Sequence, residues 1–307
     1  MPETMTPSST DRDATSAQVR ADLEEQRKQA DRRTRPDLES QRRRAQQDAE
    51  GTLDKEAIAA IQQTERALNA IAENRADEAL AAIEQATGKI TVLLSRNPAT
   101  ALIPVNMQVT VYDTAPHDID DINFIKDAAD IAMDMNELPS VRTLLDALRS
   151  EIRVRTYHLP LETYPTALRE AARLLDQKRT REAGAILLVA LNTLVAIDNV
   201  TPIPLLLAKE AISEAQSRAQ TDKEAARSLL EVADNELERT LKLGYTSADS
   251  EYKALRDEIS NLRKQLKGNE DTGSVFARLK ERLAAFTQRR SKKETRSDAK
   301  DQPRKAA

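Results

Sequence analysis

The stretch Ala183-Gly184-Ala185-Ile186-Leu187-Leu188-Val189-Ala190 decides the fold class of this chain. Ala183, Leu187 and Ala190 follow one another at intervals of four and three residues, which places them on one face of a helix. The same intervals between apolar residues recur in three other stretches, which are 79–86, 141–148 and 225–232. Each of these stretches follows a short turn. We therefore expect an all-α protein built from helical hairpins.

The composition of the 307 residues agrees with a helical fold. Ala, Leu, Glu, Arg, Lys and Gln dominate, while aromatic residues make up only 3%, Trp is absent and Gly occurs six times. The abundant residue types lose little side-chain freedom in a helix. The core must therefore consist of Ala, Leu, Ile and Val, with helices that approach one another closely over small residues.

Apolar periodicity and turn residues divide the chain into three parts. Residues 1–51 are rich in Asp, Arg, Gln, Ser and Thr, and we expect a disordered or frayed extension there. Residues 52–287 are predicted to form one helical domain, and residues 288–307 a basic, disordered tail. Helices are predicted over 55–73, 78–95, 120–135, 141–153, 165–177, 181–197, 204–219, 223–242, 249–266 and 274–287. Gly244 suits the left-handed position that ends the helix 223–242.

Two or three short insertions interrupt the helical pattern. Residues 102–116 and 154–161 contain β-branched residues and alternate weakly, so they are predicted to be extended or β-like. The proline-containing stretch 201–204 is predicted to be an extended connection. These insertions break the regular spacing of a helical repeat, so we expect a closed multi-helix bundle rather than an open solenoid.

The sequence contains none of the familiar catalytic motifs. It has no Cys, which excludes disulfides, zinc–thiolate sites, iron–sulfur clusters and a Cys nucleophile. It also lacks a Gly-x-Ser-x-Gly elbow, a His-Glu-x-x-His motif and a glycine-rich phosphate loop. We therefore predict no catalytic residue, no cofactor and no enzymatic activity.

Charge and hydropathy indicate where the protein is located and which partners it does not bind. No apolar run approaches the roughly 20 residues that a membrane-spanning helix needs. Residues 1–13 show no secretory signal, so we expect a cytoplasmic protein. The tail 287–307 holds eight basic and three acidic residues, but the net charge of the whole chain is −4 and the helical body is acidic. Specific nucleic-acid binding is therefore not expected.

Several short motifs together resemble the YfdX family. The stretch from Ala183 to Leu191 leads into Thr201-Pro202-Ile203-Pro204-Leu205, and Leu243-Gly244-Tyr245 follows later. The family's extended segments are similar in position to three further motifs, which are Ile103-Pro104-Val105, His158-Leu159-Pro160-Leu161 and Tyr164-Pro165.

The resemblance extends over about residues 55–286. It implies a compact helical bundle, a homo-oligomer, an association with the bacterial stress response and no established reaction. Many members of the family are exported. The resemblance therefore makes the periplasm the alternative location for this chain, whose charged extension departs from the family pattern.

The two histidines are the remaining candidates for a site. His117 precedes Asp118 and Asp120, which could help to bind a metal but are better explained as residues that cap the next helix, so we predict no metal site. His158 could line a ligand pocket with Tyr157 and Tyr164, or it could sense pH because histidine titrates near neutrality. A structural histidine is the plainer interpretation.

The sequence therefore predicts a non-enzymatic, oligomer-forming helical protein associated with stress. One alternative is a helical-repeat adaptor that binds a peptide or protein partner in a groove. Another is a bundle that binds a small molecule between Tyr157, His158 and Tyr164.

Overall fold

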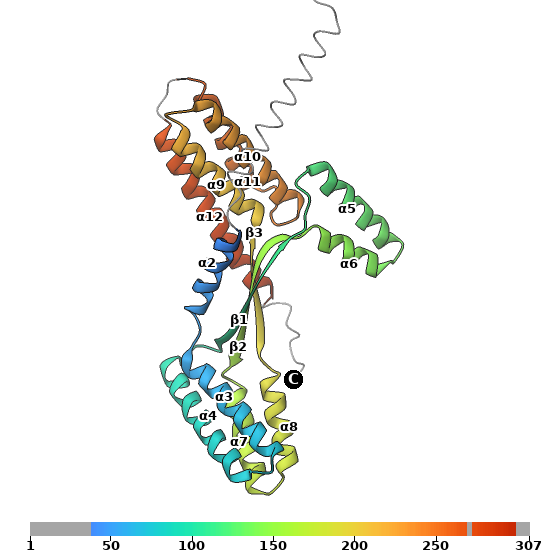
Figure 1. The fold of residues 1–307 in the computed structure, drawn as a ribbon, viewed down its shortest axis with the longest axis vertical. Helices are drawn as coiled ribbons and strands as arrows, with labels where there is room; N and C mark the ends of the chain where they lie inside the picture. The colour runs from blue at the N-terminus through green and yellow to red at the C-terminus, as the bar shows by residue number, and fades with distance from the viewer. Residues whose placement is uncertain (1–37, 269–271, 299–307) are drawn as a thin grey trace, which may run out of the picture. The chain divides into compact units, whose positions relative to one another are not determined.

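The computed structural model describes residues 38–268 and 272–298. Most of these residues are helical, and three strands form one antiparallel sheet in the order β1-β2-β3 (Figure 1). The predicted helical character is thereby confirmed. The chain divides into two compact units, of which unit 1 consists mainly of residues 111–152 and 201–292 and unit 2 of residues 42–110 and 153–200.

Unit 2 contains four helices that pack in a ring. Their bounds are α3 (Lys55–Ala72), α4 (Ala76–Arg96), α7 (Tyr164–Asp176) and α8 (Thr180–Leu191). Both α3 and α7 contact α4 and α8. Asp54 caps the N-terminus of α3, because its carboxylate accepts hydrogen bonds from the backbone N–H groups of Glu56 and Ala57. Gly184 of α8 packs against α3 so closely that a Cβ there would lie 3.2 Å from Ile71 Cγ2.

Unit 1 contains the remaining helices, apart from the polar helix α2 (Leu38–Glu50), which precedes α3 and has no buried residue. Their bounds are α5 (Ile119–Asp134), α6 (Leu138–Ala147), α9 (Ile203–Arg218), α10 (Lys223–Lys242), α11 (Ser250–Gln265) and α12 (Gly273–Asp298). Helices α9 to α12 share one apolar core. Helices α5 and α6 form a hairpin that contacts α10 through α5 (Figure 1).

Four helices end in the same type of turn. After α10, Gly244 has φ +81°, its N–H donates to the carbonyl of Leu241, and the N–H of Tyr245 donates to the carbonyl of Thr240. These paired hydrogen bonds define a Schellman motif, which confirms the role predicted for Gly244. The same pattern follows α3, α5 and α7, where the left-handed residues are Asn74, Asn136 and Lys178, with φ of 60°, 58° and 60°.

The strands are longer than the insertions predicted from sequence. Their bounds are β1 (Leu102–Asp113), β2 (Ser150–Pro160) and β3 (Val195–Pro202). The predicted extended segments 102–116 and 154–161 are confirmed. The helix predicted over 181–197 is wrong at its end, because α8 stops at Leu191 and the β-branched residues of 195–201 form β3. The helix predicted over 141–153 likewise stops at Ala147.

A buried polar network ties α10 to the ends of two strands in unit 1. Arg239, only 1% exposed, donates to the carbonyls of Ala115 at 3.1 Å and Pro116 at 2.9 Å and pairs with Glu236. The hydroxyl of Tyr245 accepts a hydrogen bond from the N–H of Ser150 at 2.9 Å and donates to Glu151 at 3.0 Å. The polar groups buried here thus have partners.

The described residues gather around two apolar cores. One core is formed by α9, α10, α11 and α12, and the other by α3, α4, α7, α8 and neighbouring strand residues. The sequence predicts a single closed interior over 52–287. The structure instead has two apolar cores, one in each unit. Each of the three strands runs from one unit into the other, and the boundary falls after residues 110, 152 and 200. At the ends, α2 begins at Leu38 within the predicted extension, and α12 continues past Gln288 to Asp298.

Candidate functional site

The structure places the three residues predicted to surround a ligand on two elements, β2 and α7. Tyr157 and His158 are consecutive residues of β2, so their side chains leave opposite faces of the strand. The Nδ1 atom of His158 lies within hydrogen-bond distance of the carbonyl oxygens of Thr156, at 3.1 Å, and Val195, at 3.3 Å. Tyr164 begins α7 and is 1% exposed. A ligand-binding or pH-sensing role for these residues stays a prediction.

Tyr164 occupies an apolar environment in unit 2. Within the described part of the chain, its hydroxyl makes no hydrogen bond of normal geometry. Burial raises the pKa of Tyr164 to about 12, and the nearby Thr64 side chain offsets part of that rise. The Thr64 hydroxyl itself donates to the carbonyl of Ala60 at 2.9 Å. Tyr164 therefore acts mainly as an apolar packing residue.

A groove of about 310 Å³ lies between α7 and α8 in unit 2. Its apolar lining comes from residues of both helices, which are Tyr164, Ala167, Ile186, Val189 and Ala190. Its polar lining consists of Thr163, Thr166, Glu170 and Thr193. Val189 is 60% exposed, which is unusual for a large apolar side chain. We name this surface the α7–α8 groove.

The charges beside the α7–α8 groove are already paired. Arg173 donates two hydrogen bonds to Glu170, at 2.6 and 2.9 Å. This pairing lowers the pKa of Glu170, which keeps its carboxylate charged. Arg179 and Glu182 form a similar pair, with hydrogen bonds of 2.6 and 2.7 Å. The surface around the groove is therefore apolar at its centre and nearly balanced in charge at its rim.

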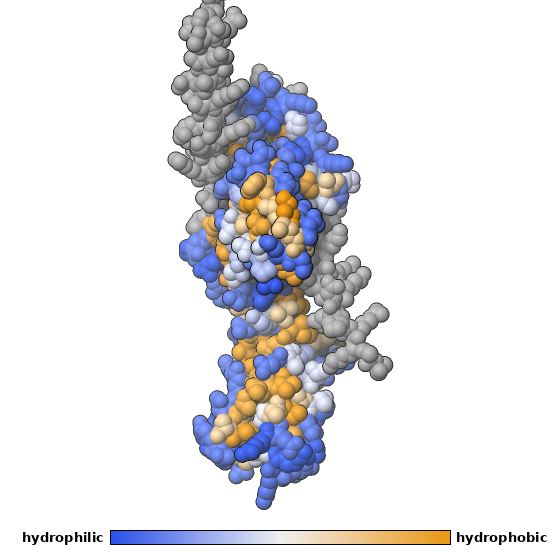
Figure 2. All heavy atoms as spheres, turned by 90° about the vertical axis from the view of Figure 1, so that its right-hand side faces the viewer, coloured by the Kyte–Doolittle hydropathy of each residue, from blue (hydrophilic) through white to orange (hydrophobic). Residues whose placement is uncertain are grey.

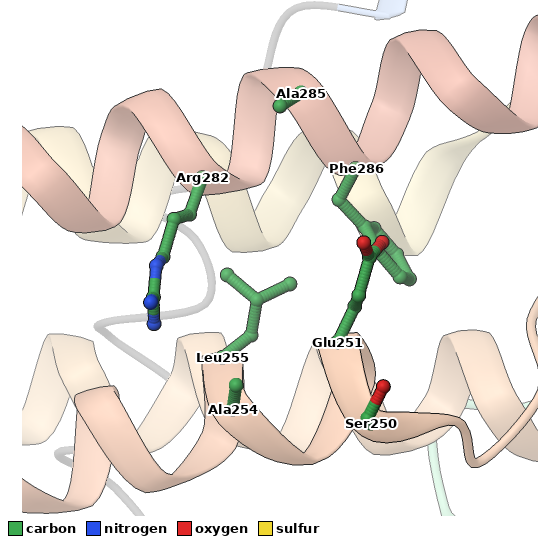
Figure 3. A pocket seen from close by; sticks show the side chains of 7 residues that line it. All are labelled: Ser250, Glu251, Ala254, Leu255, Arg282, Ala285 and Phe286. Atoms are coloured by element: carbon green, nitrogen blue, oxygen red, sulfur yellow. The ribbon is translucent and has the colours of Figure 1, made fainter.

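A second pocket, of about 250 Å³, lies between α11 and α12 in unit 1 (Figure 3). Leu255 of α11 points towards α12, between Arg282 on one side and Glu251 on the other (Figure 3). Arg282 already pairs with Glu258 at 3.2 Å. The charged groups of this pocket thus flank an apolar centre and do not converge on one point.

The α5–α6 hairpin carries most of the large apolar side chains that the described residues expose. Six of ten such side chains lie on it, and each of the six is between 52% and 73% exposed. They are Phe124, Ile131, Met133, Met135, Leu138 and Leu145. Figure 2, in which the right-hand side of Figure 1 faces the viewer, shows apolar side chains gathered over the hairpin. Exposed apolar surface of this kind marks interaction sites.

Three residues of α5 and the residue that caps its C-terminus, Met135, form a continuous apolar stripe. Phe124, Ala128, Ile131 and Met135 follow one another at intervals of four, three and four residues, which aligns them on one side of the helix. We name these four residues the α5 stripe. Asp120, Asp127 and Asp134 recur every seven residues along one edge of the stripe, and we name them the acidic flank.

Sequence reasoning missed the α5 stripe, although the apolar spacing of its residues is visible in the sequence. The apolar residues of 119–135 also include Ile122, Ala129 and Ala132, which are buried. From sequence alone, the buried and exposed sets cannot be told apart. The cap predicted before this helix is confirmed, because Asp118 accepts a hydrogen bond from the N–H of Asp120 at 2.7 Å.

The part of the chain that the structure describes contains neither a metal-binding cluster nor a helix that could span a membrane. No group of three or more His, Asp or Glu side chains there is arranged to hold a metal ion. None of the helices in the described ranges is both long and apolar enough to cross a bilayer.

Comparison with known proteins identifies a family. No curated protein matches the sequence. A solved structure of YfdX from Salmonella Typhi is similar to 49% of this chain and to 93% of its own chain, with 15% sequence identity and a TM-score of 0.34. Residues 60–200 match the model of the YfdX protein family, so the motifs beyond residue 200 lie outside the match. This region of the chain therefore belongs to the YfdX family, which confirms the resemblance that the sequence motifs indicated.

Proposed function

We propose that the protein is a non-enzymatic, oligomer-forming helical protein whose copies associate through the α7–α8 groove. The observation that carries this proposal is the exposure of Val189 beside an apolar hollow that is large enough for side chains of a second copy. Burial of this surface between two copies would be favourable, because it removes apolar area from water. The association with the bacterial stress response remains the expectation from the family resemblance.

Charge supports a second copy as the partner at the α7–α8 groove. Residues 164–191 hold five basic and three acidic side chains, and two ion pairs within this segment engage four of them. Each copy therefore carries a net charge of only +2 over this segment (5 − 3), so two copies that meet at this surface repel each other weakly. Apolar burial would not be opposed by strong repulsion.

Sedimentation velocity of the full chain at tens of micromolar tests this proposal. We expect an oligomer for the wild type and a loss of association of at least about tenfold for Val189→Asp, because a buried carboxylate without a partner is costly. Leu188→Asp is the matched control, since Leu188 is 51% exposed on the same helix but does not line the groove. A wild-type protein that stays monomeric, or equal effects of the two substitutions, would contradict the proposal.

A second candidate function is that of an adaptor that binds a protein partner. The α5 stripe favours this function, because it is apolar, exposed and bordered by carboxylates. Such a border distinguishes the stripe from the α7–α8 groove. The two surfaces can therefore serve different partners.

A further inference from the structure

We infer that the α5 stripe binds one basic amphipathic helix from another protein, packed against α5 as in a coiled coil. The inference deepens the adaptor function proposed above and does not depend on self-association through the α7–α8 groove. It rests on the spacing, exposure and charge of residues on one helix.

The shape of the α5 stripe suits a single helix. Intervals of four, three and four residues reproduce the seam of a heptad repeat, with Phe124 and Ile131 at one core position and Ala128 and Met135 at the other. Phe124, Ile131 and Met135 are 73%, 61% and 65% exposed, so the seam has no partner among the described residues. The stripe runs for about 16 Å along α5, which corresponds to about three helical turns.

Packing within the α5–α6 hairpin fixes the position of the α5 stripe before a partner binds. Ile122, Ala129 and Ala132 lie on another side of α5 and are buried. Val141 of α6 is buried as well, and α5 and α6 are in contact. Because α5 is already folded and fixed, a partner helix would order few additional groups of this protein on binding.

The charge around the stripe selects a basic partner. In the heptad frame, Asp120, Asp127 and Asp134 occupy the position that faces a partner's flanking residues, where opposite charges set the choice of partner. Over residues 118–147, the chain holds eight acidic residues and only two basic ones, Lys126 and Arg142. The Lys126 ammonium donates to the carbonyl of Lys242 at 3.1 Å. Lys or Arg residues beside the apolar seam of a partner helix would complement this negative charge.

Two other occupants fit less well. A second α5 stripe would bring a second acidic flank and no basic side chain at the flanking positions to pair with the first. The basic tail 287–307 of a second copy has suitable charge, but it contains no large aliphatic or aromatic residue to fill the seam. We therefore assign the basic, apolar helix to a different protein.

Fluorescence anisotropy with synthetic probe helices tests the inference on the full chain. The probe is a labelled peptide of three heptads with Leu in its seam and Lys on both flanks, and its control has Glu in place of every Lys. We expect the basic probe to bind at least about tenfold more tightly than the acidic probe, and to bind more weakly as salt is added, because salt screens exposed charges. Equal binding of the two probes would overturn the inference.

Matched variants locate the binding surface. Ile131→Gln should weaken binding of the basic probe at least about tenfold, because it removes a seam residue, whereas Met133→Gln should change it less than about twofold. Both side chains are more than half exposed on α5, so neither substitution should impair folding. Asp127→Asn should reduce the preference for the basic probe more than Asp130→Asn, since Asp130 lies off the acidic flank. Equal effects within either pair would overturn the inference.

The same variants separate this inference from the proposed self-association. If Val189→Asp dissociates the oligomer and leaves probe binding intact, both statements hold. A monomeric wild type that binds the basic probe would contradict only self-association. An oligomer that fails to bind the basic probe would contradict only the inference about the α5 stripe.

Discussion

The buried Tyr164 and the half-buried Tyr245 show how much depends on the hydrogen-bond partners of a single hydroxyl group. The Tyr245 hydroxyl joins Ser150 and Glu151 in unit 1, whereas the Tyr164 hydroxyl in unit 2 makes no hydrogen bond of normal geometry within the described residues. Sequence reasoning singled out Tyr164 because it lies near His158. It could not see the contacts of Tyr245, since Ser150 lies 95 positions away in the chain.

Replacement of each tyrosine by phenylalanine should therefore have different effects at neutral pH. Tyr245→Phe should lower the free energy of unfolding by about 1–3 kcal/mol, because the N–H of Ser150 loses its acceptor and the buried carboxylate of Glu151 keeps only its ion pair with Arg149. Tyr164→Phe should change it by less than about 0.5 kcal/mol, because no hydrogen bond is lost. Urea unfolding measured by circular dichroism compares the free energies of unfolding of the two variants. Equal losses of stability would contradict the different roles assigned to the two hydroxyl groups.

The same Tyr164 variant should respond differently to alkaline pH. Burial raises the pKa of Tyr164 to about 12, above the value near 10 of an unfolded tyrosine. The stability linked to this shift is fully present below about pH 10 and is lost as the pH rises towards 12. Tyr164→Phe should therefore lose less stability than the wild type between these values, and identical curves would contradict the raised pKa.

At the scale of secondary-structure elements, the helix turns share one geometry but differ in the residue that forms it. Gly244 was predictable, because glycine is the usual left-handed residue at the end of a helix. Asn74, Asn136 and Lys178 adopt the same conformation with a side chain, and Lys178 in particular gives no sequence signal for it. A left-handed conformation is costly for any residue with a Cβ.

Lys178→Gly should accordingly stabilise the turn between α7 and α8. We expect the free energy of unfolding to rise by about 0.5–1 kcal/mol, because relief of the left-handed strain exceeds the added freedom of the unfolded chain. Gln177→Gly is the control, since Gln177 has φ −78° and glycine there should lower stability by a similar amount. Thermal unfolding of both variants checks the sign, and a loss of stability in Lys178→Gly would contradict the argument.

Element boundaries were predicted well where a cap or turn residue marks them. The helices predicted over 204–219 and 223–242 agree with α9 and α10 to within one residue. The helix predicted over 181–197 failed because Val195, Ala196 and Ile197 continue an apolar run that suits either a helix or a strand. Pairing with β2 stabilises the extended conformation of this segment. Arg155 of β2 also donates two hydrogen bonds of 2.7 Å to Asp198 of β3.

At the scale of the whole molecule, composition predicted the helical character but not the two cores. Each core combines segments that are far apart in the sequence, such as 42–110 with 153–200 in unit 2. Periodicity identifies the buried face of each helix but not the helix that covers it. The exposed α5 stripe was missed for the same reason, because exposure depends on which surfaces remain without a partner after packing.

Core truncations should show that the two cores are separate. Leu168→Ala in unit 2 and Leu230→Ala in unit 1 each remove a side chain that is fully buried, and each should cost about 2–5 kcal/mol. Hydrogen exchange measured by mass spectrometry should then accelerate mainly in the unit that carries the substitution. Equal acceleration throughout both units in either variant would indicate one cooperative structure instead.

The separate cores also make the protein convenient for optical study. The sequence contains no Trp, so the wild type has no indole fluorescence. Phe276 is buried in the unit 1 core and Tyr164 in the unit 2 core, and either aromatic ring could be exchanged for an indole. One such exchange at a time would give each half of the protein its own spectroscopic signal.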